Sequence, residues 1–375
     1  MDARLVEGIG RIDPTVWDAL VPSGDPFVRH AFLELLETSG SATPRTGWQP
    51  LHVVVEDAGR PVAAAPLYAK SHSWGEYVFD HGWAEALERA GGRYYPKLQV
   101  AVPFTPVPGP RLLAAEDDAR DVLARTLVDL PERLGLSSLH VTFCREAEAH
   151  ALVRAGCLLR RGIQYHWHNR GYRDFQDFLD VLKSAKRKMI RKERAAVRDA
   201  GIDVEVLHAD TLDPALLADF HAFYVATVDK RWGTAYLTRA FFAELAKRVG
   251  SHVVYVVARR QGQIVGAALN LWGDDALYGR VWGCLDDYRF LHFECCYYAA
   301  IEFAIARGIA RVEAGAQGTH KLLRGYEPVP TWSAHKLRDP GFESAVARFL
   351  AQEHRQRERE IEEARELLPY ARPGG

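Results

Sequence analysis

The chain has 375 residues, of which 48% are hydrophobic and 26% charged, a balance typical of a globular protein with the length of about two domains. Its formal net charge of -1 excludes a global electrostatic field that attracts nucleic acid or acidic membranes. Any affinity for such partners therefore requires a local basic patch.

Cysteine usage and the lack of long apolar runs define the expected compartment. Five cysteines, an odd number with no CxxC pair, argue against a disulfide framework and a structural zinc site. The N-terminus lacks a basic region followed by an apolar run, and no stretch of about 18 apolar residues occurs. We therefore predict a cytoplasmic protein with reduced thiols and no integral membrane association.

In the first half, short strand patterns alternate with helical periods. Residues 32–38 have the pattern of a short helix, and residues 51–57 and 61–70 that of a hairpin around a Gly-Arg turn. The remaining predicted strands and extended segments cover residues 76–80, 94–104, 137–144 and 157–169, and the remaining predicted helices cover residues 83–91, 118–135 and 146–156.

The second half begins again with a helical pattern. One helix is predicted over residues 175–201, and three strands joined by two turns are predicted over residues 252–283. Further helices are predicted at 215–233, 239–250, 295–308 and 342–368, and further strands at 202–208, 310–316 and 331–337. Both halves share the order helix, hairpin, strand, helix, strand, which indicates a weak structural pseudo-repeat.

This pattern predicts an α/β (α+β) fold with two mixed sheets flanked by helices, in tandem and of the acyltransferase type. We place the first domain at residues 1–169, the second, catalytic domain at 170–341, and a charged C-terminal helix and tail at 342–375. A Rossmann domain is the competing class, and it is rejected because no GxGxxG opens a helix after an early strand.

The stretch EAGAQGTHKLLRGYEP, residues 313–328, concentrates polar groups after a predicted strand. A glycine-rich turn there presents side chains and free N–H groups at a sheet edge, where ligands of open α/β folds commonly bind. We expect Lys321 to stabilise the oxyanion formed when an amine attacks an ester carbonyl, and His320, Glu313 or Glu294 to accept the amine proton. The alternative is a salt-bridged loop in which Glu313 pairs with Arg324.

A basic segment, KSAKRKMIRKERAAVR, carries eight basic residues and one acidic residue between Lys183 and Arg198. Helical spacing places four of its arginines along one stripe, suited to a tRNA acceptor stem or a phosphate-bearing substrate. The alternative is a solvated charged face. The candidate phosphate-binding residues are Lys186, Arg187, Lys188, Arg191, Lys192 and Arg194.

The order ALYGRVWG, DDYRFLHFE and then a helix is that of the GNAT acyltransferase core. CoA-dependent enzymes of this shape usually have a glycine-rich basic loop at this junction, whose backbone N–H groups bind pyrophosphate. Bulky residues at 290–293 replace it, which argues against ordinary CoA binding in this half.

Two smaller motifs have structural alternatives. His166 and His168 alternate on a predicted strand as two metal ligands would, but without a third ligand a hydrogen-bonded pair is favoured. Cys295-Cys296 at a helix start has the position of an activated thiol, and a buried helix face is the favoured alternative. No metal is expected.

Several long motifs carry a resemblance that extends over roughly residues 27–350: SHSWGEYVFDHGWAEA, GGRYYPKLQVAVPFTPVPGPRLL, SSLHVTFC, QYHWHN, KRKMIRKER, KRWGTAYLTRAFF, ALYGRVWG, LHFECCYYAAIEFAI and EAGAQGTHKLLRGYEPVPTWSAH. Together they resemble the bacterial FemAB-like family of GNAT proteins, often labelled peptidoglycan biosynthesis or recognition proteins. The resemblance implies two tandem GNAT-like domains and acyl transfer to an amine, with aminoacyl-tRNA as a donor.

The segment HKLLRGY also resembles the Fem pattern of a lysine four residues before a glycine-aromatic pair, which implies that Lys321 holds the donor or the developing charge. The substrate-binding residues expected in these motifs are His292, Gln317, Arg324, Tyr326, Tyr278, Arg280, Trp282 and Tyr297. The chain departs from the expected family residues at Val281, Ala299 and Lys336, which suggests another small amine, such as a natural-product intermediate, as acceptor.

The resulting hypothesis is an aminoacyltransferase that forms an amide between an aminoacyl group, donated by aminoacyl-tRNA, and an amine of a small-molecule, peptidoglycan-like or natural-product acceptor. One alternative is an acyl-CoA-dependent N-acyltransferase. Another is a recognition module that holds a peptide without turnover. Neither a bound cofactor nor DNA is expected.

Overall fold

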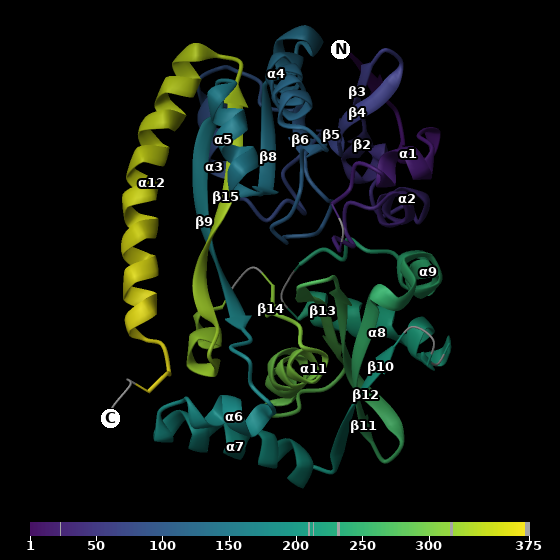
Figure 1. Cartoon of the computed structure of the whole chain (residues 1–375), viewed down its shortest axis with the longest axis vertical. Helices are drawn as coiled ribbons and strands as arrows, with labels where there is room; N and C mark the ends of the chain where they lie inside the picture. The colour runs from purple at the N-terminus through teal and green to yellow at the C-terminus, as the bar shows by residue number, and fades with distance from the viewer. Residues whose placement is uncertain (23, 209–210, 213, 231–232, 316–317, 372–375) are drawn as a thin grey trace. The chain divides into compact units, whose positions relative to one another are not determined.

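The computed structural model describes residues 1–22, 24–208, 211–212, 214–230, 233–315 and 318–371 (Figure 1). The chain forms two compact units. The first unit contains Met1–Ile163 and Pro330–Glu360, and the second contains Gln164–Val329 and the chain from Ile361 onward. Strands β9 (Leu158–His168) and β15 (Glu327–Leu337) and helix α12 (Pro340–Glu366) therefore contribute residues to both units.

The first unit has a sheet of order β1-β3-β4-β7 and a second sheet of order β2-β5-β6-β8-β15. In the second sheet β6 and β8 are parallel, whereas the pairs β2/β5, β5/β6 and β8/β15 are antiparallel. Besides β15, the first unit contains, in chain order, β1 (Asp2–Val6), α1 (Pro14–Asp18), α2 (His30–Thr38), β2 (Trp48–Pro50), β3 (His52–Asp57), β4 (Arg60–Ala65), β5 (Leu67–Lys70), α3 (His81–Arg89), β6 (Lys97–Val100), β7 (Leu113–Ala114), α4 (Asp117–Leu134), β8 (Ser138–Cys144) and α5 (Glu146–Arg154).

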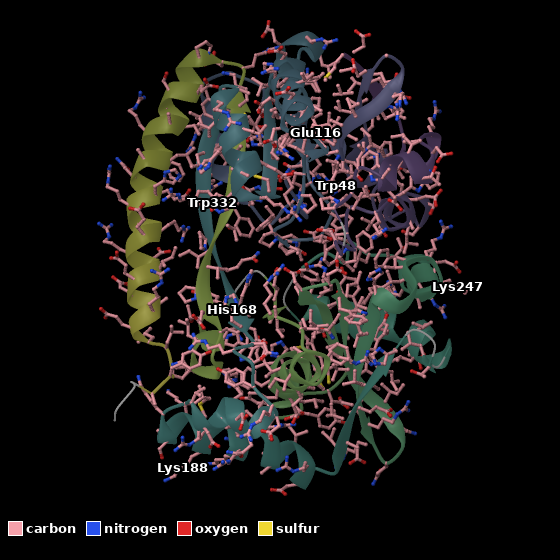
Figure 2. All side chains as sticks on the ribbon, in the orientation of Figure 1. Trp48, Glu116, His168, Lys188, Lys247 and Trp332 are labelled. Atoms are coloured by element: carbon pink, nitrogen blue, oxygen red, sulfur yellow. The ribbon has the colours of Figure 1, made fainter. Side chains whose placement is uncertain are left out.

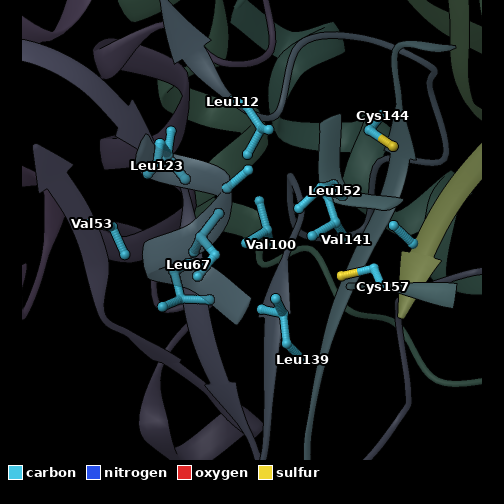
Figure 3. Packing of buried hydrophobic residues seen from close by; sticks show 14 of the residues in the cluster. Val53, Leu67, Val100, Leu112, Leu123, Leu139, Val141, Cys144, Leu152 and Cys157 are labelled. Atoms are coloured by element: carbon cyan, nitrogen blue, oxygen red, sulfur yellow. The ribbon is translucent and has the colours of Figure 1, made fainter. Parts of the chain in front are cut away.

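Alternation along these strands separates an apolar face from a polar one. Leu98, Val100 and Val141 lie on the apolar face and pack with α4 and α5 into a dry core, part of which Figure 3 shows. The intervening positions Lys97, Gln99 and His140 are equally buried but polar. Both faces of this sheet are therefore covered, and only one of them is hydrophobic.

The second unit has one sheet, of order β10-β11-β12-β13-β14-β9. Neighbours are antiparallel except β13 and β14, which are parallel. Its remaining elements are α6 (Phe175–Asp180), α7 (Ser184–Asp199), β10 (Ile202–His208), α8 (Pro214–Asp229), α9 (Arg239–Val249), β11 (Val253–Arg260), β12 (Gln263–Trp272), β13 (Ala276–Cys284), α10 (Leu291–Phe293), a π-helix η5 (Glu294–Tyr298), α11 (Ala299–Arg307), β14 (Arg311–Glu313) and a 3-10 helix η6 (Thr319–Arg324).

Each unit contains a short parallel pair whose strands then separate. Strands β13 and β14 pair from Ala276 with Arg311 to Tyr278 with Glu313, and β13 continues to Cys284 paired with β12 but no longer with β14. Strands β6 and β8 likewise share three paired positions, after which β8 continues to Cys144. The strand next to each parallel pair comes from the other half of the chain. Strand β15, late in the sequence, pairs with β8 of the first unit, and β9, earlier in the sequence, pairs with β14 of the second unit. The pseudo-repeat expected from the sequence thus appears in the sheet pairing.

Some local predictions were wrong. The single helix expected over 175–201 is two helices, α6 and α7, and the Arg187 guanidinium donates to the carbonyls of Asp180 and Leu182 at the break between them. Residues 76–80 form no strand, since Glu76 and Asp80 turn inward to bind Lys97 Nζ. Among the described residues, no helix combines the length and apolar character needed to cross a bilayer.

Candidate active site

A row of polar side chains crosses the second unit's sheet where β13 and β14 separate. The pairing aligns Tyr278 of β13 with Glu313 of β14, and Glu313 with His166 of β9. All three side chains are buried. Their strand neighbours Leu277, Val312 and Trp167 belong to the apolar core on the opposite face, as alternation requires. This row of the site is therefore built on strands.

Lys321, on η6, is a buried cation in the second unit. Its side chain is only 1% exposed, and Nζ donates a hydrogen bond to the Gly315 carbonyl at 2.7 Å. Within the part of the chain that the structure describes, no carboxylate pairs with Nζ. Burial lowers the Lys321 pKa to about 8, although the nearby Cys296 thiol acts in the opposite direction. The ammonium is therefore weakly compensated and suited to stabilise an added negative charge.

Glu313 is held by groups on its own strand and on β9. Arg311 Nε donates to Glu313 Oε1 at 2.8 Å, and His166 Nε2 lies 3.6 Å from Oε2. Arg311 also binds Asp275 and donates to the Tyr278 hydroxyl at 3.4 Å. Glu313 therefore pairs with Arg311, and the loop-closing pair with Arg324 that the sequence allowed is not formed.

Arg324 anchors η6 to helix α7. Its Nη2 donates to both carboxylate oxygens of Glu193 at 2.8 and 2.9 Å, and its Nε donates to the Tyr298 hydroxyl at 2.9 Å. Its Nη1 binds the His320 carbonyl at 2.9 Å, and its guanidinium carbon lies 3.6 Å from the centre of the Phe293 ring. These contacts occupy the whole guanidinium, so Arg324 positions the turn that carries Lys321.

An aromatic group adjoins this turn. His320 is exposed, and its Nε2 lies 2.8 Å from the Tyr297 hydroxyl. His292 packs edge-on against both Trp282 and Tyr297, with ring centres 5.7 and 5.3 Å apart. Tyr326 is fully buried beneath Tyr297. The exposed His320 and the half-buried His292 therefore border the turn, whereas Tyr297 and Tyr326 belong to the core.

The structure separates Glu294 from the other proposed proton acceptors. Its buried carboxylate faces α7, where Arg194 Nη2 binds Oε1 at 2.8 Å and Arg194 Nη1 binds Glu302 Oε1 at 2.8 Å. Burial raises the Glu294 pKa, and Arg194 opposes that effect. This pairing also removes Arg194 from the basic residues available to an anionic ligand.

The other basic residues of α7 divide between local contacts and solvent. Arg187 binds the carbonyls that end α6, and Arg191 donates to Gln176 Oε1 at 3.0 Å. Lys186, Lys188 and Lys192 have no ion-pair partner among the described residues, and Lys188, marked in Figure 2, and Lys192 are exposed. Ile190 and Val197 dock the helix on its apolar side.

The remaining candidates lie as follows. Arg280 and Trp282 are half-buried on β13, and Gln317 lies outside the described residues. His168, marked in Figure 2, is half-buried two positions from His166, and the described residues contain no cluster of three metal-ligating side chains. Cys295 is buried, and burial raises its pKa. Cys296 is half-buried.

Sequence reasoning missed two residues that organise the site. Glu193 was noted only as the single acidic residue among eight basic ones. A lone acidic residue in a basic helix could have indicated that its side chain is buried and paired with a cation from another element. His166 was considered as a metal ligand, whereas its pairing with Glu313 depends on the register of β9 against β14. No local sequence pattern determines that register.

Comparison with known proteins places the chain. The family model for FemAB-like proteins, described as peptidoglycan biosynthesis/recognition, matches residues 8–372. The C-terminal domain of a putative lysylphosphatidylglycerol synthetase from Agrobacterium fabrum superposes with a TM-score of 0.58 at 9% identity, covering 92% of this chain and 96% of that one. FemX superposes with a TM-score of 0.57 at 10% identity, covering 92% and 100%. A search of curated proteins found no match.

A third solved structure, L-PGS from Bacillus licheniformis, superposes with a TM-score of 0.54 at 9% identity, covering 90% of this chain and 97% of that one. At such identities the likeness establishes the fold, and the predicted class of tandem GNAT-like domains with mixed sheets flanked by helices is confirmed. Family and fold together indicate a transferase of the acyltransferase type. The chain therefore belongs to the FemAB-like family.

Proposed function

We propose that this protein forms an amide bond by transferring an aminoacyl group from aminoacyl-tRNA to the amine of a small-molecule or peptidoglycan-like acceptor. The observation that carries the proposal is Lys321, a buried ammonium without a carboxylate partner in the described chain, beside the point where β13 and β14 separate. A buried positive charge costs free energy unless an anion compensates it. An oxyanion that exists only during the reaction is such a compensating anion.

In this proposal the acceptor nitrogen attacks the carbonyl carbon of the donor ester. The carbonyl oxygen becomes negative and is stabilised by Lys321 Nζ together with backbone N–H groups of the turn. Collapse of the adduct breaks the bond to the ribose oxygen, which leaves with a proton that the nitrogen has lost. Arg324 acts indirectly, because its pairing with Glu193 holds η6 in place.

Two features support tRNA over CoA as the donor. Lys186, Lys188 and Lys192 give α7 positive groups without protein partners in the described chain, and phosphates are the usual partners of such groups. At the junction where CoA would bind, Phe290 has a φ of 65° and Leu291 N is bonded to the Tyr288 carbonyl at 3.2 Å. The bulky side chains there obstruct close approach of a pyrophosphate to the backbone. We place the activity in the cytoplasm, where charged tRNA is available.

The test is incubation of the purified protein with a charged tRNA pool and candidate amines, followed by mass spectrometry of the product. We expect product that disappears when the tRNA is first digested with ribonuclease. Product that is insensitive to ribonuclease excludes this donor, and tight 1:1 binding of acetyl-CoA by calorimetry favours the CoA-dependent alternative.

A charge-reversal variant tests the contribution of α7. Changing Lys186, Lys188 and Lys192 together to glutamate should weaken tRNA binding and reduce the salt dependence of log K by about 3, since each phosphate contact contributes about 0.9 to that slope. Lys247→Glu on α9, also an exposed lysine, is the matched control and should leave both quantities unchanged. Equal effects of the two variants would show that α7 has no particular role.

A further inference from the structure

His166 has one nitrogen fixed by acceptors and the other without a hydrogen bond. Its Nε2 lies 3.3 Å from Gln164 Oε1 and 3.6 Å from Glu313 Oε2. Both oxygens can only accept, so Nε2 carries the proton and Nδ1 holds the lone pair. No described residue donates to Nδ1. The hydrogen bond to Gln164 Oε1 fixes the ring, and the Glu313 carboxylate lies within ion-pair distance of Nε2, which leaves the Nδ1 lone pair to accept a proton.

The charges around His166 keep it neutral. Burial lowers its pKa to about 3, with further contributions from Arg311, His168 and Lys321, and Glu313 is the carboxylate that faces it. A neutral imidazole is therefore present at physiological pH. Its conjugate acid, once formed, is a strong proton donor, which suits protonation of a leaving alkoxide better than prolonged storage of the proton.

The first unit offers an internal comparison at the equivalent position. There the corresponding row, set by the register of β6, β8 and β15, is Gln99, His140 and His335. The two histidines bond to each other through their Nδ1 atoms at 2.7 Å, and each is 1% exposed. This row contains no carboxylate, and each imidazole uses its Nδ1 on the other. His140 Nε2 bonds further to Ser138 Oγ at 2.8 Å and His335 Nε2 has no hydrogen bond, so the second unit's row is distinguished by the carboxylate that faces its histidine.

We propose that His166 carries the proton from the attacking nitrogen to the leaving oxygen. Formation of the C–N bond makes the nitrogen cationic and acidic, and His166 Nδ1 takes its proton. As the C–O bond breaks, the same proton passes to the departing oxygen, which leaves as a hydroxyl. Glu313 and Gln164 act as positioning residues that fix the tautomer. The inference rests on the proposed acyl transfer and assigns the proton acceptor within it, in place of His320, Glu294 and Glu313.

The test compares two nucleophiles in wild type, His166→Gln and His168→Gln. Hydroxylamine is weakly basic, and its adduct loses a proton to water without help, whereas a primary amine requires an acceptor. We expect His166→Gln to lower kcat for the primary amine by about 100-fold or more with KM unchanged, in the range of lost acid–base catalysis. Transfer to hydroxylamine should fall less than about tenfold, and His168→Gln, changed on the same strand, should match wild type.

Equal losses with both nucleophiles, or no loss with the amine, would overturn the assignment. If His166→Gln does not fold, Glu313→Gln supplies the second measurement, because it leaves His166 in place and should reduce transfer to the amine more than transfer to hydroxylamine. Absence of transfer to either nucleophile by the wild type would instead refute the proposed function itself, and the assignment to His166 with it.

Discussion

Replacing Lys321 with methionine should abolish transfer and yet stabilise the fold at pH 7. Burial lowers the Lys321 pKa from 10.5 to about 8. This difference of about 2.5 pKa units corresponds to about 3 kcal/mol of cost for holding the charge in the folded state. Methionine loses the hydrogen bond to the Gly315 carbonyl, which is worth about 1 kcal/mol. The expected net gain in the free energy of unfolding is about 2 kcal/mol.

The pH dependence identifies the source of this gain. Unfolded lysine keeps its proton up to pH 10.5, whereas folded Lys321 loses it near pH 8. Between these values the unfolded state binds more protons, so the stability of the wild type rises with pH. Lys321→Met removes this contribution. The gap between variant and wild type should therefore be largest below pH 8 and should shrink towards pH 10.5.

Hydrogen exchange measured by mass spectrometry is the appropriate assay, because it reports the second unit separately from the first. Lys97→Met is the matched control. Lys97 is also fully buried, but it donates to Ser73, Glu76 and Asp80, and these acids raise its pKa. Its loss should destabilise the first unit by about 3–5 kcal/mol. A Lys321→Met variant less stable than wild type at pH 7 would refute the argument.

Three other predictions concern the fold around the site. Arg324→Met should cost about 3–5 kcal/mol by leaving the Glu193 carboxylate buried without its partner, and adding Glu193→Gln should recover part of this loss in a denaturation series. Gly283→Ala should destabilise by about 1–3 kcal/mol or more, since its Cβ would lie 2.5 Å from the Phe223 carbonyl carbon, whereas Gly82→Ala in α3, with nothing within 4 Å, should raise the melting temperature. The first unit should lose protection against exchange as pH falls from 6.5 towards 3, because burial lowers the His140 pKa to about 3 and unfolding lets this imidazole take up a proton; unchanged protection at pH 4.5 would contradict this.

The sequence predicts helices and strands well where one hydrophobic periodicity, helical or alternating, runs through the whole segment. The apolar/polar repeat of residues 118–135 gives α4, and the turn at Gln261-Gly262 joins β11 to β12 as expected. The break between α6 and α7 was missed because the charged helical pattern continues through residues 181–183, whose backbone direction depends on Arg187 reaching back to α6. A side chain that caps a neighbouring helix leaves no trace in periodicity.

A turn rich in polar groups after a strand was enough to single out Lys321 in the sequence. The ion pairs of the charged residues around it could be assigned only from the tertiary structure. Arg324 and Glu313 are eleven residues apart and of opposite charge, so sequence alone permits their pairing. The structure instead pairs Arg324 with Glu193 and Glu313 with Arg311. Because tertiary packing decides which ion pairs form, Arg324 pairs with a residue on a distant helix and Glu313 with one on its own strand.

The exchange of strands explains why the same fold yields two different polar faces. Strand β9 supplies His166 to the second unit, and β15 supplies His335 to the first, so both rows end in a histidine. The rows differ in their first residue, Tyr278 against Gln99, and in their middle residue, Glu313 against His140. The Glu313 carboxylate faces Nε2 of His166, whereas His140 bonds to Nδ1 of His335; the second nitrogen of His166 and that of His335 have no hydrogen bond among the described residues. The side chain on the central strand therefore decides whether the histidine of the row faces a carboxylate or another imidazole.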